Sequence, residues 1–293
     1  MIYTLTLNPA IDCTVFLDEF RTGEMNRAHR QEITPGGKGV NVSLALKEFG
    51  IPGIALGFVA GHTGKMLLSL LQERGIKADF IETACGETRI NIKMCPPYKY
   101  GNFEETEINS PGPEINADEH RALIAKVSQL SFADTLILSG NAPGEYGRVY
   151  FDELLSAIKQ TGCRFIADLS GSLLSKAVRK KPWLIKPNKA ELEDLTRTVL
   201  NDIDDVYYAA EQLLRSGRAE NVLASLGSGG AVLASSEGTY NKTAPAGEVV
   251  STVGAGDTLL AGFIAAVCGG ASMEKALEAG VLAGSRKAFG LPL

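Results

Sequence analysis

Residues 251–258 read Ser-Thr-Val-Gly-Ala-Gly-Asp-Thr, and an apolar helical stretch follows from Leu259 to Val267. Three small residues at this junction let successive backbone N–H groups point at one place, with the positive end of the next helix behind them. They are Gly254, Ala255 and Gly256. Such a group of amides can hold a polyanion whose charge is moving, as in phosphoryl transfer, and Asp257 could take the proton of an attacking hydroxyl. A plain glycine-rich turn before a core helix would explain this segment equally well by itself, so the catalytic hypothesis depends on the rest of the chain.

Around this stretch, apolar β-rich runs alternate with helical periodicity. We predict strands at Ile2–Leu7, Ile54–Val59, Thr135–Ser139, Arg164–Asp168, Trp183–Lys186 and Asn221–Ser225. We predict helices at Val40–Phe49, Lys65–Arg74, Ala117–Leu130, Val149–Thr161, Ala190–Thr196, Val206–Ser216, Asp257–Cys268 and Met273–Ala288. The alternation predicts an α/β protein with a largely parallel sheet and helices on both of its faces.

Two stretches, Asp12–Thr34 and Thr88–Asn109, carry short alternating segments with no helix between them. We expect antiparallel strands that form one small accessory sheet from two separate places in the chain. Because ligands bind at the carboxyl edge of a parallel sheet, this second sheet is expected to be a lid over that edge. Neither stretch could fold alone, so we expect one α/β domain over residues 1–293, with a lid built from about 12–34 and 88–109.

The composition narrows the class of protein. The formal net charge of -5 gives no general attraction to nucleic acid or to an anionic membrane, so anionic ligands need local basic groups. Five scattered cysteines without a C-x-x-C pair argue against a disulfide framework and for a reducing compartment. With no visible secretory signal and no apolar run long enough to span a membrane, we expect a cytoplasmic protein.

The first predicted strand leads into Asn-Pro-Ala-Ile-Asp at residues 8–12. A dinucleotide-binding fold would have G-x-G-x-x-G here, so a nicotinamide dehydrogenase is disfavoured. At the end of a strand, the Asp12 carboxylate could accept hydrogen bonds from sugar hydroxyls. An Asp that simply forms a turn is the equally good structural alternative.

A second glycine-rich junction runs from Pro35 to Ser43 and contains Gly36, Gly37, Lys38 and Asn41. The glycines permit close backbone approach, Lys38 supplies a cation, and the start of the helix adds N–H donors. The segment is not a P-loop, because G-x-x-x-x-G-K-[ST] is absent. A helix-starting turn would explain the glycines but would leave Lys38 and Asn41 without a role, so a ligand-binding function is favoured.

Basic and amide side chains alternate along one face of a predicted lid strand, at Arg89, Asn91 and Lys93. Arg27 lies in the other lid segment. Together with Lys38 these residues could form a local cationic pocket for a phosphate monoester, despite the acidic net charge. A solvated strand face would suffice to explain the strand by itself.

Residues 186–191, Lys-Pro-Asn-Lys-Ala-Glu, follow a predicted strand and open a helix. Asn188 and Glu191 share one face at the start of that helix, where they could hold the water shell of a magnesium ion. The same spacing is a capping box, and spacing alone favours the cap. Residues 225–230, Ser-Leu-Gly-Ser-Gly-Gly, form a glycine-rich turn suited to nucleotide phosphates or ribose, or to a plain hairpin.

Taken together, these segments resemble the ribokinase-like carbohydrate kinases, in the phosphofructokinase B branch. Residues 36–42 with Gly50 resemble the N-terminal signature of that family, and residues 251–257 resemble its C-terminal one. Residues 186–191 and 225–227 lie between them in the expected order. The resemblance covers essentially the whole chain. It implies a three-layer α/β/α sandwich with a mostly parallel central sheet and a small β-sheet lid.

The resemblance also implies roles for the residues. Asp257 would be the catalytic base, and the amides of Gly254, Ala255 and Gly256 would stabilise the migrating phosphoryl group. The sugar phosphate would contact Asp12, Gly36, Gly37, Lys38, Asn41, Arg89 and Ser139, with Arg27 nearby. Asn188 and Glu191 would organise Mg²⁺, while Lys186, Asn188, Ser225, Gly227 and Gly230 would line the ATP side. Some relatives hold a monovalent cation near the anion hole, where Ser251 and Val253 occupy the matching loop.

Within the family, residues 88–93 and 106–113, with Gly23–Arg27, are similar to the branch that phosphorylates fructose 1-phosphate to fructose 1,6-bisphosphate. Tagatose-6-phosphate kinases share the pattern at Gly86–Arg89 and are the alternative. The related 6-phosphofructokinases usually have Lys where Glu24 stands. A catalytically silent sugar-phosphate sensor is an alternative of another class, disfavoured by the intact Asp257. An exposed lid strand could also pair two subunits into a homodimer.

Overall fold

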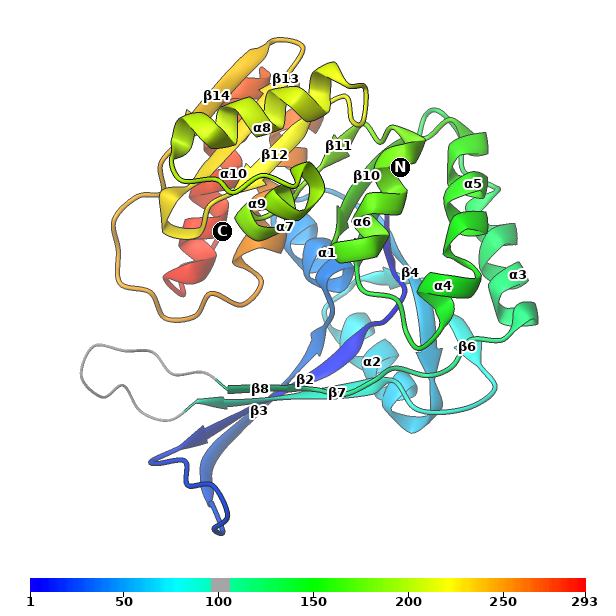
Figure 1. Ribbon diagram of the computed structural model, residues 1–293. Coiled ribbons are helices and arrows are strands. Elements are labelled where there is room, and N and C mark those ends of the chain that lie inside the picture. The colour runs from blue at the N-terminus through cyan, green and yellow to red at the C-terminus, as the bar shows by residue number, and fades with distance from the viewer. Residues whose placement is uncertain (96–105) are drawn as a thin grey trace.

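The computed structural model describes residues 1–95 and 106–293. Its main sheet has the order β14-β13-β12-β11-β10-β9-β1-β4-β5, and β6 also pairs with β4 (Figure 1). Every pairing from β12 to β5 is parallel, whereas β12–β13 and β13–β14 are antiparallel. The strands are β1 Ile2–Thr6, β4 Gly53–Ala60, β5 Lys77–Ala78, β6 Ile81–Thr83, β9 Thr135–Gly140, β10 Arg164–Leu169, β11 Leu184–Ile185, β12 Val222–Ser225, β13 Ala231–Ser235 and β14 Gly238–Lys242.

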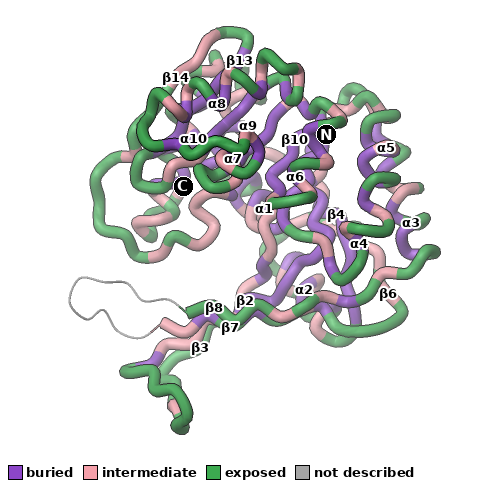
Figure 2. Tube along the Cα trace, viewed as in Figure 1, coloured by how far each residue is buried: buried purple, intermediate pink, exposed green. Residues whose placement is uncertain are grey.

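Helices cover both faces of this sheet, because successive residues of its buried strands point in opposite directions. On β9, Leu136 and Leu138 pack into a core with α3, α5, α6, α7 and α8, while Ile137 packs into a second core with α1, α9 and α10. The helices are α1 Lys38–Glu48, α2 Gly61–Glu73, α3 Ala117–Val127, α4 Tyr146–Val149, α5 Phe151–Thr161, α6 Gly171–Ala177, α7 Lys189–Thr196, α8 Ile203–Arg215, α9 Ala255–Cys268 and α10 Met273–Ala288. Figure 2 shows the buried strands between helices whose outer sides are exposed. The predicted three-layer α/β/α architecture is therefore confirmed.

The predicted helices and strands are largely present, with several differences, among them the antiparallel strands β13 and β14, which are not among the predicted strands. The helix predicted at Val149–Thr161 is divided at Tyr150 into α4 and α5. Helix α6, which is short and follows β10, was not predicted. The sequence also did not predict β5 and β6, since two- and three-residue strands carry too little periodicity to be recognised. In the described residues, no helix has both the length and the apolarity to cross a membrane.

A separate four-stranded sheet, the lid sheet, projects from the main body in the order β3-β2-β7-β8 (Figure 1). Its strands are β2 Ala10–Leu17, β3 Ala28–Gly36, β7 Arg89–Cys95 and β8 Thr106–Asn109. The prediction of antiparallel pairing is correct for β2–β3 and β7–β8 but wrong for β2–β7, which is parallel. Both β2 and β7 follow strands that end at the same edge of the main sheet, so they enter the lid sheet in the same direction. Residues 96–105 of the predicted lid lie outside the described residues.

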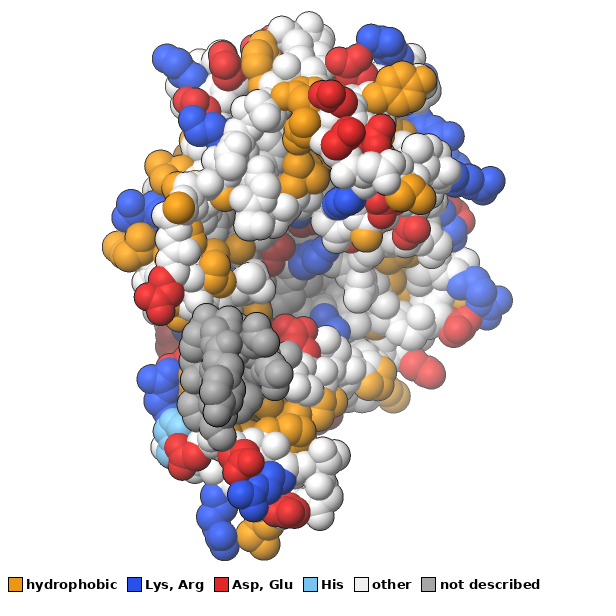
Figure 3. Space-filling model, turned by 60° about the vertical axis from the view of Figure 1, so that its left-hand side comes forward, with side chains coloured by type: hydrophobic (Ala, Val, Ile, Leu, Met, Phe, Trp, Pro, Cys, Tyr) orange, Lys and Arg blue, Asp and Glu red, His pale blue; other side chains and the backbone are white. Residues whose placement is uncertain are grey.

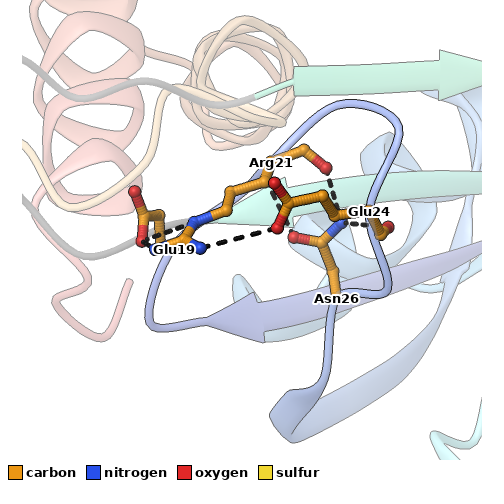
Figure 4. Close-up of polar contacts among 4 residues, drawn as sticks. All are labelled: Glu19, Arg21, Glu24 and Asn26. Carbon is orange, nitrogen blue, oxygen red and sulfur yellow. Dashed lines mark hydrogen bonds and ion pairs between the residues drawn. The ribbon is translucent and has the colours of Figure 1, made fainter.

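The loop between β2 and β3 is organised by its own polar side chains (Figure 4). Arg21 Nη2 lies 2.7 Å from Glu19 Oε2, and the Arg21 amide donates to Asn26 Oδ1 at 2.8 Å. Asn26 Nδ2 in turn donates to the Arg21 carbonyl at 2.8 Å. Arg27, which follows directly, is thus held at the exposed end of the lid sheet.

Candidate active site

The carboxyl ends of the parallel strands and the first turns of α1 and α9 meet at one edge of the main sheet. Ser139 and Asp168 are paired neighbours near the ends of β9 and β10, and Lys186 directly follows β11. Because parallel strands all end at the same edge, side chains far apart in the sequence come together there. Figure 3 shows basic and acidic side chains side by side in a hollow at this edge, between the lid sheet and the main body.

Asp257 lies in the first turn of α9 with only 6% of its surface exposed. Asn41 of α1 donates a hydrogen bond from Nδ2 to Asp257 Oδ2 at 2.8 Å. This bond joins the two glycine-rich segments that the sequence analysis singled out, across 216 residues of chain. It holds one carboxylate oxygen at a fixed place beside the start of the helix.

The amides at the start of α9 differ in their availability. Gly254 is the N-cap residue, in the left-handed conformation at φ 72°, and no side chain caps the helix. The Ala255 N–H donates to the Thr252 carbonyl at 3.2 Å, so one of the three predicted amides is already used in a turn. The N–H groups of Gly254, Gly256 and Asp257 have no acceptor among the described residues, as is usual at the start of a helix. These three are free to bind an anion.

Asp168, at the end of β10, is a site residue that the sequence analysis missed. It is fully buried, and its Oδ1 lies 3.1 Å from Lys186 Nζ and 3.6 Å from Lys38 Nζ. Neither of its oxygens has a well-aligned hydrogen bond within the described part of the chain. A carboxylate at the end of an apolar strand is the same signal that drew attention to Asp12, and it could have identified Asp168 as well.

Two of the charged groups at this edge, Asp257 and Lys38, have raised pKa values. Burial, followed by the nearby Asp168 carboxylate, raises the pKa of Asp257 to about 6, while Lys186, the Asn41 hydrogen bond and Lys38 oppose that rise. The negative charge of Asp168 is the main cause that raises the pKa of Lys38, with smaller contributions from Glu191 and Asp257. A carboxyl group with a pKa of about 6 is ionised at neutral pH yet basic enough to accept a proton.

On the side of the lid sheet, Asp12 is buried and uses both carboxylate oxygens. Asn91 Nδ2 donates to Oδ1 at 3.0 Å, and Lys93 Nζ donates to Oδ2 at 2.9 Å. Gly36 lies so close that a Cβ there would collide with the Asp12 carboxylate. The predicted cationic pocket is therefore smaller than expected, since the charge of Lys93 is matched by Asp12.

The other predicted sugar-phosphate residues differ in position. Arg89 is half-buried, its Nε donates to the Asn8 carbonyl at 3.2 Å, and burial lowers its pKa. Ser139 Oγ is buried without a hydrogen-bond partner among the described residues and faces the same edge of the sheet. Arg27 is exposed on the β2–β3 loop and does not line the cavity beside the site.

The residues predicted for magnesium and the nucleotide form local structure. Asn188 and Glu191 make a complete capping box at the start of α7, with bonds of 2.8 and 2.9 Å, as the spacing favoured. Residues 225–230 turn from β12 into β13, and the Leu226 amide donates to the Gly230 carbonyl. Asn188 forms a bridge with Ser225, so the two segments are adjacent. No cluster of three metal-ligating side chains was found in residues 1–95 and 106–293.

A cavity of about 840 Å³ lies beside Asp257, between the lid sheet and the ends of α1, α9 and α10. Its lining includes Asp12, Lys93, Asn41, Gly254 and Lys287. A volume of this size is typical of a small-molecule site.

Comparison with known proteins identifies relatives over the full length of the chain. The sequence profile of the pfkB family carbohydrate kinases matches residues 4–288. The "1-phosphofructokinase" of Bacillus subtilis is 37% identical over 99% of this chain and 93% of its own length. The "D-tagatose-1-phosphate kinase" of Bacillus licheniformis is 34% identical over 99% of this chain and 93% of its own length.

Solved structures agree with these matches. Phosphofructokinase-2 from Escherichia coli in complex with substrates and products superposes with a TM-score of 0.92 at 32% identity, covering 98% of this chain and 93% of that one. The tetrameric inhibited form of the same enzyme has a TM-score of 0.90 at 32% identity, and the match covers 99% of this chain and 94% of that one.

We predict that Asn41→Ala raises the pKa of Asp257 above its value of about 6. The Asn41 hydrogen bond favours the ionised carboxylate, and its loss should increase proton affinity by about tenfold. The measurement is a ¹³C NMR titration of labelled Asp carboxyls, with Asp257→Asn to assign the signal and the exposed Asn201→Ala as control. An unchanged midpoint in Asn41→Ala would show that this bond does not tune the carboxylate.

Proposed function

This chain belongs to the pfkB family of carbohydrate kinases, and we propose that it transfers the terminal phosphoryl group of ATP to fructose 1-phosphate, giving fructose 1,6-bisphosphate. The observation that carries the proposal is Asp257, a buried carboxylate with a pKa of about 6 at a helix start with three free amides. Relatives from Bacillus subtilis and Borreliella burgdorferi, 37% and 39% identical, are named 1-phosphofructokinase and support the choice of sugar phosphate.

In this proposal, Asp257 accepts the proton of the attacking sugar hydroxyl while the Gly256 and Asp257 amides stabilise the charge on the moving phosphoryl group. The Asn41 hydrogen bond aims the carboxylate. Lys186 supports the same site, because a Cβ placed on Gly256 would lie 3.5 Å from Lys186 Nζ. Positioning and charge neutralisation would supply most of the rate enhancement.

The sugar phosphate is proposed to lie between the lid sheet and the edge of the main sheet. Asp12, fixed by Asn91 and Lys93, would accept hydrogen bonds from sugar hydroxyls. The unpartnered Ser139 hydroxyl would face the sugar from the other side, and Arg89 would supply positive charge for its phosphate. The lid sheet would exclude water, which would otherwise compete as the phosphoryl acceptor.

Mg²⁺ fits the acidic groups on the nucleotide side. Asp168 Oδ1 already faces the Lys186 and Lys38 ammonium groups, whereas Oδ2 is buried without a hydrogen-bond partner among the described residues and would be available to a cation. The negative charge of Glu191 also raises the pKa of Lys38, so Glu191 lies on the same side of the site. Together with Asn188 it would hold water molecules that coordinate the ion. When bound, the ion would neutralise the phosphate charge, and Lys186, Ser225, Gly227 and Gly230 would line the ATP side.

We predict that kcat/KM is at least about tenfold higher for fructose 1-phosphate than for tagatose 6-phosphate or fructose 6-phosphate, since discrimination comes from differential transition-state binding. ADP release measured for all three in one assay tests this. A higher value for another ketose phosphate would reassign the substrate. Sugar-phosphate binding without any ADP release would instead favour the silent sensor.

We predict that Asp257→Asn lowers kcat by about 10²–10⁴-fold, with KM for the sugar phosphate within about threefold. Because the base must be deprotonated, the wild-type rate should fall about tenfold for each pH unit below a midpoint near 6. Initial rates from pH 4.5 to 8 provide the measurement, and the exposed Asp194→Asn is the matched control. Full turnover by Asp257→Asn would remove the base from the mechanism.

We also propose that two copies pair through the lid sheet. Its outer face is apolar: Ile33, Ile90, Ile92 and Ile108 are 38–51% exposed, and the register places Ile33, Ile92 and Ile108 in one row across the strands. The inner face carries the buried Asp12, Asn91 and Lys93. An apolar face that points away from the protein's own core is suited to an identical face on a second subunit.

We predict that Ile92→Glu weakens self-association by about 100-fold, since it places an unpaired charge in the apolar row. Sedimentation velocity over a concentration series measures this, with Val199→Glu, 73% exposed elsewhere, as control. A wild-type chain that remains monomeric at all concentrations would refute the pairing.

A further inference from the structure

Helices α9 and α10 lie antiparallel and unusually close because small residues face each other along their contact. A Cβ placed on Gly280 would lie 2.8 Å from the Leu259 carbonyl oxygen, and one on Gly284 would lie 2.9 Å from that of Ala255. The two contacts are one helical turn apart on each helix. They fix the last turn of α10 beside the first turn of α9, where Asp257 and its amides lie.

Lys287 lies in that last turn of α10, about one turn beyond Gly284. A Cβ placed on Gly254 would lie 3.6 Å from Lys287 Cε and 3.8 Å from Asn41 Nδ2. The lysine side chain therefore reaches the start of α9, next to the Asn41 side-chain amide that donates a hydrogen bond to Asp257. It also lines the 840 Å³ cavity that extends under the lid sheet.

A structural role as a charge at the end of α10 is the simplest alternative, because basic residues in a last turn offset the helix dipole. Arg286 is a second basic residue in that last turn and can fill this role, while its Nε donates to the Pro292 carbonyl just beyond the helix. For the Lys287 ammonium, the structure of residues 1–95 and 106–293 gives no carboxylate or carbonyl partner. An unpaired cation beside the positive end of another helix is electrostatically unfavourable unless an anion binds between them.

We propose that Lys287 is a further phosphate-binding residue, which contacts the phosphoryl group that the Gly256 and Asp257 amides hold during transfer. The inference rests on the proposed kinase function and adds a residue to its machinery. Lys186 Nζ lies near Gly256 and Lys287 Cε lies near Gly254, so both lysine side chains reach the start of α9. Together they match the charge of a terminal phosphate better than the amides alone.

The test compares the affinity of two nucleotides by calorimetry: a non-hydrolysable ATP analogue and ADP. Lys287→Met should bind the ATP analogue about 10- to 100-fold more weakly, because a charge-assisted hydrogen bond to the terminal phosphate is lost. ADP affinity should stay within about threefold, since ADP lacks that phosphate, and Lys287→Arg should retain most of the ATP-analogue affinity. The exposed Lys275→Met, at the other end of α10, is the matched control.

Equal loss for both nucleotides, or no loss for either, would overturn the proposal. So would a loss of fructose 1-phosphate affinity with unchanged nucleotide binding, which would place Lys287 in the sugar site. Thermal unfolding verifies that Lys287→Met is folded, and Lys287→Gln replaces it otherwise. Nucleotide affinities can be measured without turnover, so they test Lys287 even if the wild type phosphorylates none of the ketose phosphates. That absence of activity would refute the proposed function but not the role of Lys287 in nucleotide binding.

Discussion

Four charged groups govern the rest of this site: Asp168, Asp257 and Lys186 are buried, and Lys38 is partly exposed. Asp168 is fully buried, Asp257 nearly so, and the ammonium groups of Lys186 and Lys38 lie 3.1 and 3.6 Å from Asp168. Burial raises the pKa of Asp257 most, repulsion from the Asp168 carboxylate adds to the rise, and the lysines compensate only in part, so the pKa reaches about 6. Such an arrangement is poor for stability. It creates a basic carboxylate and local positive charge in an acidic protein, as phosphoryl transfer requires.

Glycines that allow close contact between neighbouring elements determine where the charged groups of the site lie. Gly36 admits the Asp12 carboxylate, and Gly280 and Gly284 admit the backbone of α9, so that the last turn of α10 lies beside the amides of the site. Larger side chains at these positions would push the elements apart and with them the ligand groups. The lid sheet shows a related constraint, because its polar side chains are buried toward the site and its isoleucines are exposed. That polarity is the reverse of a sheet that covers its own core, and it is consistent with an outer face that meets a second subunit.

Much of the fold could be predicted from the chain. The long helices and buried strands were recognised because their periodicity extends over many residues, and the capping box at Asn188 because its partners are three residues apart. Elements of two or three residues, the division at Tyr150 and the short α6 have no such signal. The parallel pairing of β2 with β7 was missed because direction depends on where each strand leaves the main sheet, which local sequence does not record. Asp168 was overlooked although it ends an apolar strand, the signal that singled out Asp12, whereas Lys287 lies in no motif.

The sequence by itself determined the fold class, the two glycine-rich helix starts and the chemistry of the groups that follow them, since backbone freedom and side-chain type are properties of neighbouring residues. Only the tertiary structure decided which charges face one another. It joined Asn41 to Asp257, matched Lys93 with Asp12 so that less free charge remains for a phosphate, and brought Lys287 to the start of α9. The physical reason is that electrostatic coupling depends on distance and burial in space, which helix packing and strand order set and which separation along the chain does not reveal.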